Sequence, residues 1–379
     1  MQNEINETDF SYYDLAVIGG GPTGTLAAAL AAETGLSTIV LEKKRYPRNK
    51  ICGGFLSARS ISLLPKDLRL SSLPSESIYQ VSIIKKRQPY IYNSKTRLGM
   101  VIEREQLDHL MAKYACSKGA VIMERQTLQT IKRTEEKKEK FWPYILETGN
   151  SAGTKYKARY VIAADGAMGE TALLAGLRSN KKGPAGWGMS KIVKARSKVA
   201  ETGAVKFYPL PFLGGMGWSF SGPDWTNHGV GGLFGRKLLL KAYHRIFPGD
   251  SDSANPHAWP LPFLGPLQKA AAGNLLLTGD AAGLTDPFSG EGFYNSFKSS
   301  ILAVRAITAA EKGNREAGEL YSKFFKQHFR NGFTASLVGA FFMHGLSITN
   351  PSALPHAMAA LMVNRLWFNR DIDDFPRQF

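Results

Sequence analysis

Short apolar runs and glycine-rich turns alternate at the start of the chain. An apolar run from Tyr13 to Ile18 is followed by Gly19, and an Ala/Leu-rich stretch from Thr23 to Thr34 precedes a second apolar run from Ser37 to Leu41. This order predicts a strand, a tight turn, a helix and a second strand. Together they form the βαβ unit of a parallel sheet, and Gly35 stands where the helix should end.

The rest of the chain divides into segments of different periodicity. Residues 105–118 carry apolar positions at helical spacing, and the run from Tyr160 to Ala164 predicts another buried strand. Aromatic and glycine-rich stretches between Gly183 and Pro262 predict a mainly β region, and the pattern is helical from about Glu291. We therefore expect an α/β protein with a discontinuous Rossmann-like nucleotide domain (1–75, 99–180 and 266–330), an inserted, mainly β substrate domain (76–98 and 181–265) and a helical C-terminal segment (331–379).

Composition narrows the class of protein. The chain has 379 residues, of which 44% are hydrophobic and 21% charged, so a disordered or fibrous protein is excluded. Only Cys52 and Cys116 are cysteines, which excludes a disulfide framework and a cysteine-rich zinc site, and no metal is expected. Residues 1–10 are acidic and contain no secretory apolar run, so we expect a cytoplasmic protein.

A long uncharged segment lies near the end of the chain. No Asp, Glu, Lys or Arg occurs from Asn331 to Asn364, but Pro351 and Pro355 divide the segment. Its first half, Phe333 to Ile348, is shorter than the roughly 20 apolar residues of a membrane-spanning helix. The pattern predicts two packed or interfacial helices, which allows membrane contact but no spanning helix.

A glycine-rich loop joins the first predicted strand to the first helix. Gly19, Gly21 and Gly24 satisfy G-x-G-x-x-G, in which the glycines permit a tight turn, backbone approach to a pyrophosphate and close packing of helix on strand. Pro22 belongs to the same loop, and the helix N-terminus that follows favours phosphate groups. Glu42 ends the second strand, where a carboxylate can accept hydrogen bonds from an adenosine ribose. A dinucleotide is expected here, and the spacing leaves both FAD and a nicotinamide cofactor open.

Three further segments resemble the flavoprotein hydroxylase and geranylgeranyl reductase superfamily. The segment Leu277–Gly283 (LTGDAAG) with Asp286–Gly292 (DPFSGEG) is similar to its second FAD fingerprint. Val101–Asp108 is similar to its Arg-x-x-Leu-Asp helix start, and Pro47–Gly54 to a loop of the geranylgeranyl reductase and flavin-halogenase branches. With the glycine loop, these motifs cover most of the chain outside residues 180–265. The resemblance implies that the cofactor is FAD.

The resemblance also assigns cofactor contacts. Asp280 would bond the ribityl chain, and Arg104 would lie beside the phosphate and ribityl region. Gly292 and Phe293 would present backbone near the pyrimidine end of the isoalloxazine, where a helix N-terminus stabilises the negative charge of reduced flavin. The further contacts that we expect are Lys43, Arg48, Cys52, Gly53 and Gly290.

A reduced flavin can pass hydride to a polarised double bond, or it can react with oxygen to hydroxylate an electron-rich ring. Gly217–Phe220 resembles the centre of a motif linked to isoprenoid chains in geranylgeranyl reductases, but Leu213, Met216 and Ser221 replace its two prolines and its tyrosine. The Trp-x-Trp-x-Ile-Pro signature of flavin halogenases is absent. The candidates for the substrate pocket are Trp218, Phe220, Cys52 and Phe288, and no catalytic residue is assigned.

The net positive charge of the chain indicates which kinds of binding partner to expect. The chain has 48 Lys and Arg against 31 Asp and Glu, a net charge of +17, yet no nucleic-acid-binding module accompanies it. An acidic protein partner fits better. The family resemblance implies hydroxylation of an aromatic group, either on a partner protein, as in similar maturases that build a quinone cofactor from tryptophan, or on a carrier-bound substrate. The alternatives are reduction of C=C bonds in an apolar or aromatic substrate, and a non-catalytic flavin-binding protein. NAD(P)H or a separate reductase would supply electrons, because no second glycine motif follows.

Overall fold

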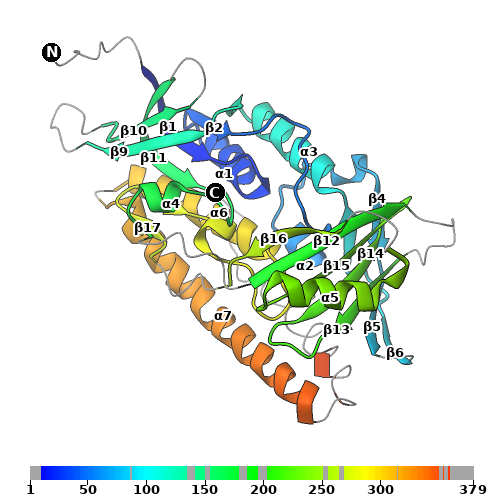
Figure 1. Ribbon diagram of the computed structural model, residues 1–379. Coiled ribbons are helices and arrows are strands. Elements are labelled where there is room, and N and C mark those ends of the chain that lie inside the picture. Colours follow the sequence, from blue (N-terminus) through cyan, green and yellow to red (C-terminus); the bar gives the residue numbers. More distant parts are fainter. Residues whose placement is uncertain are drawn as a thin grey trace.

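The structure of the protein is a computed structural model. The residues that it describes are 10–85, 88–134, 141–149, 154–178, 186–194, 203–250, 255–263, 269–313, 315–349, 353 and 357–358. Two large sheets and two long C-terminal helices make up most of this part of the chain (Figure 1).

The first sheet has eight strands, and its central strands are parallel. The order is β17-β18-β11-β1-β2-β8, and β10 and β9 continue antiparallel from β11. Since β18, β11, β1, β2 and β8 all run the same way, their carboxyl ends meet at one edge. The bounds are β1 (Phe10–Ile18), β2 (Thr38–Glu42), β8 (Val121–Glu124), β9 (Leu128–Arg133), β10 (Tyr144–Thr148), β11 (Lys155–Ala163), β17 (Ala271–Ala272) and β18 (Leu275–Leu277).

Helices cover this sheet. Helix α1 is nearly all Ala, Leu and Thr and is buried on most sides, because it packs between the sheet and two further helices, α3 and α6. Helix α6 packs in turn against α7. The bounds are α1 (Pro22–Glu33), α2 (Ala58–Ile61), α3 (Arg104–Ser117), α4 (Thr171–Leu174), α6 (Phe293–Glu311) and α7 (Ala317–Thr349).

The second sheet has seven strands in the order β16-β12-β15-β14-β13-β5-β6, and helix α5 packs on β12 and β15. Its strands come from two distant segments, because β5 pairs in parallel with β13. A small sheet, β3-β7-β4, adjoins it in sequence. The bounds are β3 (Phe55–Ser57), β4 (Ser75–Ile78), β5 (Gln80–Lys85), β6 (Gln88–Asn93), β7 (Gly99–Ile102), β12 (Gly186–Lys194), β13 (Ala204–Pro209), β14 (Met216–Ser221), β15 (Trp225–Gly232), α5 (Arg236–Ile246) and β16 (His257–Leu261).

These features confirm the predicted fold class, a Rossmann-like α/β domain with an additional β-rich sheet and C-terminal helices. The C-terminal helix begins earlier than the uncharged segment suggested. Helix α7 starts at Ala317 and runs without interruption past Phe333 to Thr349. Pro351, Pro355 and most of the expected second helix lie outside the described residues. Within the described part of the chain, none of the helices has both the length and the apolar character needed to cross a membrane.

Candidate active site

A cavity of about 800 Å³ lies between the two large sheets. On one side are the turns that follow the parallel strands β1, β2 and β11, which is where open α/β sheets bind ligands. On the other side are β12, β14, β15 and β16 of the seven-stranded sheet. The lining includes these predicted cofactor residues: Gly19, Gly21, Pro22, Glu42, Lys43, Arg48, Cys52, Gly53, Arg104, Asp280, Gly290, Gly292 and Phe293.

The glycine loop needs its glycines for distinct reasons. Gly19 has φ +100°, and a Cβ on it would lie 2.5 Å from the carbonyl oxygen of Ala164. Gly24 does not line the cavity, but a Cβ there would lie 2.0 Å from the carbonyl oxygen of Gly19, so this glycine lets α1 pack closely on β1. A Cβ on Gly21 would meet only Arg48 within 4 Å, at 3.6 Å. Gly21 is also the N-cap of α1 and supplies no side-chain cap, so the helix's first N–H groups are available to a ligand.

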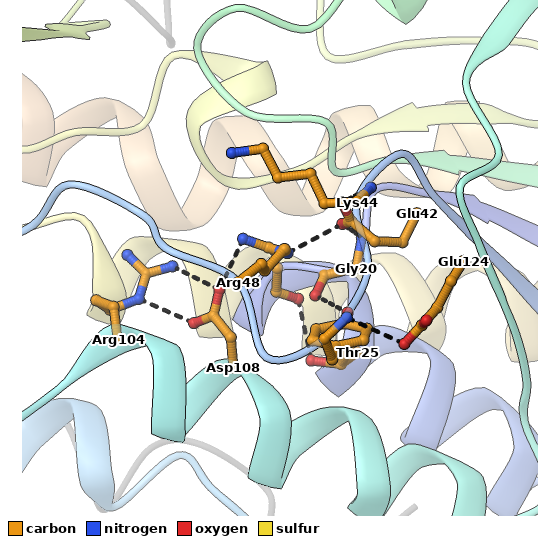
Figure 2. A network of polar contacts seen from close by, with 10 residues as sticks. Gly20, Thr25, Glu42, Lys44, Arg48, Arg104, Asp108 and Glu124 are labelled. Carbon is orange, nitrogen blue, oxygen red and sulfur yellow. Dashed lines mark hydrogen bonds and ion pairs between the residues drawn. The ribbon is translucent and has the colours of Figure 1, made fainter.

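The Glu42 carboxylate holds this loop in place (Figure 2). Its Oε2 accepts a 2.8 Å hydrogen bond from the backbone N–H of Gly20. Its Oε1 accepts a 2.8 Å hydrogen bond from the backbone N–H of Lys44. The Tyr46 hydroxyl donates to the Gly20 carbonyl. A carboxylate has about four acceptor positions, so Glu42 retains capacity for a ribose hydroxyl.

A buried ion network connects the loop after β2 to helix α3 (Figure 2). Asp108 is fully buried and accepts bonds from Arg104 Nε at 2.9 Å and Nη2 at 3.2 Å, while Arg48 Nη1 lies 3.1 Å from its Oδ2. Burial alone would lower the pKa of Arg104, but the charge of Asp108 raises it. Both arginines were expected to contact the cofactor, whereas Asp108 had no expected role beyond its place in a motif.

Lys50 was not singled out from the sequence, although it lies in the loop that carries the family resemblance. Its Nζ sits 3.5 Å from the centroid of the Trp259 ring on β16, and both residues line the cavity. Burial lowers the pKa of Lys50 to about 8, against the opposing effect of Asp280. The lowered pKa allows this amine to exchange a proton near neutral pH.

The turn before α6 is fixed by two carboxylates. Asp286 Oδ1 accepts hydrogen bonds from the backbone N–H groups of Phe288 (3.1 Å) and Ser289 (2.7 Å). Glu291 accepts 2.6 Å hydrogen bonds from the hydroxyls of Ser57 and Ser60, and its burial raises its pKa. This turn carries Gly292, the N-cap of α6, to the cavity wall without a side-chain cap.

Asp280 lies in the 3₁₀ turn Gly279–Ala282 after β18 and accepts a 3.1 Å hydrogen bond from Thr285. Asp165 contributes a different signal. Its Oδ1 is a buried polar atom at the cavity that makes no hydrogen bond among the described residues. Such an orphaned atom is uncommon in native proteins and points to a polar ligand. The volume also suits a large cofactor with a substrate beside it.

Aromatic side chains form the wall on the second sheet. Trp218 and Phe220 both line the cavity, with ring centroids 6.2 Å apart. A Cβ on Gly53 would lie 2.8 Å from the Phe220 ring, so a glycine lets the loop approach this wall. Asn227 connects this loop to the aromatic wall by two hydrogen bonds. Its side chain accepts one from Trp218 Nε1 (2.9 Å) and donates one to the carbonyl oxygen of Cys52 (3.0 Å).

A second, smaller cavity of about 40 Å³ adjoins the large one. Gly214 and Met216 line both cavities. Phe288, predicted for the substrate pocket, lines the smaller cavity, whose far wall is formed by Ala340 and Met343 of α7. The other pocket candidates, Trp218, Phe220 and Cys52, line the large cavity.

A Rossmann-like sheet, an uncapped helix at a glycine loop and a cavity walled by a second sheet define a dinucleotide-dependent enzyme with a separate substrate side. The family model "FAD binding domain" matches residues 12–211, more than half of the chain, and the chain belongs to this family. It is an FAD-dependent oxidoreductase, as the sequence predicted.

Curated relatives cover most of the chain. "Conditioned medium factor receptor 1" of Dictyostelium discoideum is 28% identical over 91% of this chain and 73% of its own length. "Menaquinone reductase" of Mycolicibacterium smegmatis is 24% identical over 95% and 92%. "Digeranylgeranylglycerophospholipid reductase" of Methanocaldococcus jannaschii is 26% identical over 85% and 82%.

Solved structures share the fold. A geranylgeranyl bacteriochlorophyll reductase-like protein from Thermoplasma acidophilum has a TM-score of 0.77 at 22% identity, covering 94% of this chain and 97% of that one. A probable FAD-dependent monooxygenase from Pseudomonas aeruginosa has a TM-score of 0.70 at 14% identity, covering 92% and 99%. The same fold therefore occurs in a reductase-like protein and in a probable monooxygenase.

Proposed function

We propose that this oxidoreductase reduces carbon–carbon double bonds in an apolar, chain-like substrate. One observation supports the proposal: a small cavity of about 40 Å³ lies against α7 and shares the lining residues Gly214 and Met216 with the large cavity. A substrate site that continues from the large cavity in this direction would suit a long apolar chain better than a compact aromatic group. Two of the relatives support this choice, since their names specify reductases of menaquinone and of a digeranylgeranyl lipid.

The residues on the sheet side fit FAD. The N-terminus of α1, opened by Gly21, would hold the pyrophosphate, and Glu42 would accept from the adenosine ribose. Arg48 and Arg104 would neutralise phosphate charge, and Asp280 would bond the ribityl chain. The remaining predicted contacts, which line the same cavity, would complete the binding surface: Gly19, Pro22, Lys43, Cys52, Gly53, Gly290, Gly292 and Phe293.

When bound and reduced, the flavin would supply hydride, and the protein must provide position, exclusion of water and a proton. Trp218 and Phe220 would hold an apolar double bond and keep water away from it. Adding hydrogen across a double bond also requires one proton on the second carbon. The Lys50 ammonium is the donor that we assign, because its Nζ lies at the cavity and its pKa is about 8. NAD(P)H or a separate reductase would supply the electrons.

Aromatic hydroxylation, on an acidic partner protein or a carrier-bound molecule, stays a prediction. The Pseudomonas aeruginosa neighbour shares the fold at 14% identity and does not distinguish the two reactions. We set aside the non-catalytic alternative, because two relatives that align with most of this chain are named as reductases.

An anaerobic experiment tests the proposal. The FAD-bound protein is reduced chemically under argon and mixed with polyprenyl quinones or polyprenyl lipids of different chain length. We expect reoxidation of the flavin without oxygen and a product that carries two additional hydrogens in its polyprenyl chain, which distinguishes it from a quinol reduced at the ring. A matched variant, Met216→Trp, should fill the junction of the two cavities and slow long chains more than short ones, with FAD binding retained. Turnover that requires oxygen and yields a hydroxylated product would overturn the proposal in favour of oxygenation.

A further inference from the structure

The outer face of α7 changes in character along its length. Its exposed residues follow one another at helical spacing of three or four, so they lie on one side. Lys323, Lys326 and Arg330 are exposed near the start of this face. Further along, three large apolar side chains are exposed instead: Val338 (62%), Phe341 (56%) and Phe342 (56%).

Those apolar residues are exposed on a helix whose inner face is well packed. Phe325, Phe329, Phe333, Ala340 and Met343 are all buried. The exposed phenylalanines therefore lie outside this packed face, and several large apolar side chains exposed on one side of a helix indicate a binding face. Figure 1 shows α7 as a long helix, coloured orange, along one side of the molecule.

We propose that the outer face of α7 docks on an anionic lipid surface, with Val338, Phe341 and Phe342 inserted among the lipids and Lys323, Lys326 and Arg330 against the headgroups. The positive charge of this face favours an anionic lipid surface over other partners. The face is basic and apolar, it has no acidic residue in α7 after Glu319, and the whole chain has a net charge of +17. An amphipathic helix with aromatic and basic residues lies in the plane of an interface rather than across it. Anionic headgroups attract each basic residue near the surface.

The position of this face links it to the cavities. Ala340 and Met343, next to the exposed phenylalanines in sequence, line the small cavity from the inside. A lipid chain leaving the bilayer at Phe341 would therefore enter beside α7 and reach the large cavity past Met216. This entry route rests on the proposed function, whereas docking itself does not.

Vesicle flotation of the full-length, FAD-bound protein tests docking without any substrate. We expect binding to vesicles of phosphatidylcholine with phosphatidylglycerol, and binding of Phe341→Ser/Phe342→Ser weaker by about tenfold or more, since two large apolar side chains are lost. The matched control is Ile91→Thr/Ile192→Thr, which changes two apolar residues of 49% and 52% exposure on the seven-stranded sheet and should bind like the wild type. FAD absorbance and circular dichroism confirm that each variant is folded.

A second variant tests the contribution of the basic residues to vesicle binding. Lys326→Glu/Arg330→Glu should weaken binding to the anionic vesicles by about fivefold or more and leave binding to phosphatidylcholine alone unchanged. The proposal is overturned if the wild type does not bind anionic vesicles, if the control loses binding equally, or if the phenylalanine variant changes only the oligomeric state, which would make the face a contact between copies.

An activity comparison separates the two proposals. The phenylalanine variant should lose turnover of a vesicle-embedded polyprenyl acceptor and keep turnover of a short, water-soluble one. Failure of the proposed reaction would abolish both turnovers in the wild type while vesicle binding persisted.

Discussion

The Lys50 ammonium lies over the Trp259 ring, with Nζ 3.5 Å from its centroid. This contact joins the loop after β2 to β16, so one pair of side chains connects the two sides of the cavity. Since the amine is also desolvated, its charged form costs stability in the folded protein before an anionic cofactor is bound.

Replacing Lys50 by Met should therefore change the pH dependence of stability. The folded-state pKa is about 8 and the ordinary value 10.5, so between these values the unfolded chain binds more protons and wild-type stability rises with pH. The advantage of Lys50→Met over the wild type should be largest below pH 8 and shrink toward pH 10.5. Urea unfolding of FAD-depleted protein across this range measures it, and a difference independent of pH would contradict the lowered pKa.

Asp108 should be among the most sensitive polar positions in the fold. Asp108→Asn leaves the buried Arg104 without its counter-charge and Arg48 with Glu42 alone, and we expect a loss of about 3–5 kcal/mol in the free energy of unfolding. The matched control is Asp67→Asn, at an exposed pair with Lys118, which should change stability little because solvent screens it. Equal losses in the free energy of unfolding at the two sites would show that the buried network stabilises the protein no more than the exposed ion pair does. Chemical denaturation measures both.

Replacing each of two helical glycines by alanine should change the stability of the protein in opposite directions. Gly24→Ala places a Cβ 2.0 Å from the Gly19 carbonyl oxygen, and separating α1 from β1 should cost about 1–3 kcal/mol. Gly332→Ala in α7 meets no atom within 4 Å and should stabilise by about 0.5–1 kcal/mol. Thermal unfolding of both variants checks the pair. A neutral Gly24→Ala with unchanged FAD affinity would contradict the close packing.

Glu291→Gln tests the buried carboxyl before α6. Burial raises the pKa of Glu291 above its ordinary 4.5, so above that pH the folded protein holds more protons than the unfolded chain, and stability falls as pH rises through the folded-state pKa. The glutamine variant does not titrate. Its stability relative to the wild type should therefore increase with pH from about 4.5 upward, as measured by denaturation at several pH values. A relative stability that falls over this interval would rule out a raised pKa.

Short-range patterns could be interpreted from the sequence because their geometry is local. Gly19, Gly21 and Gly24 follow a strand at fixed spacing, and Arg104 begins a helix, so each position was predictable. Lys50 and Trp259 could not be paired, since their contact depends on how the second sheet closes over the first. The same holds for Glu291, whose two serine donors lie at the end of β3 and on α2.

Met216 shows most directly what could not be predicted from the sequence. In the sequence it was only a departure from a proline-containing motif, whereas the fold places it where two cavities meet. Helix α7 is a similar case. Charge depletion marked residues 331–364, but the packing of Tyr321, Phe325 and Phe329 makes the helix begin at Ala317.

The parallel pairing of β5 with β13 also constrains how the chain acquires its shape during synthesis. The β5–β6 hairpin leaves the ribosome well before β13 is made, and until then one of its edges has no neighbour in the seven-stranded sheet. Closing so distant a pairing is slow, and an open strand edge can join the wrong partner in the meantime. The nascent enzyme therefore passes through a period of vulnerability to aggregation that ends only when Ala204–Pro209 emerges.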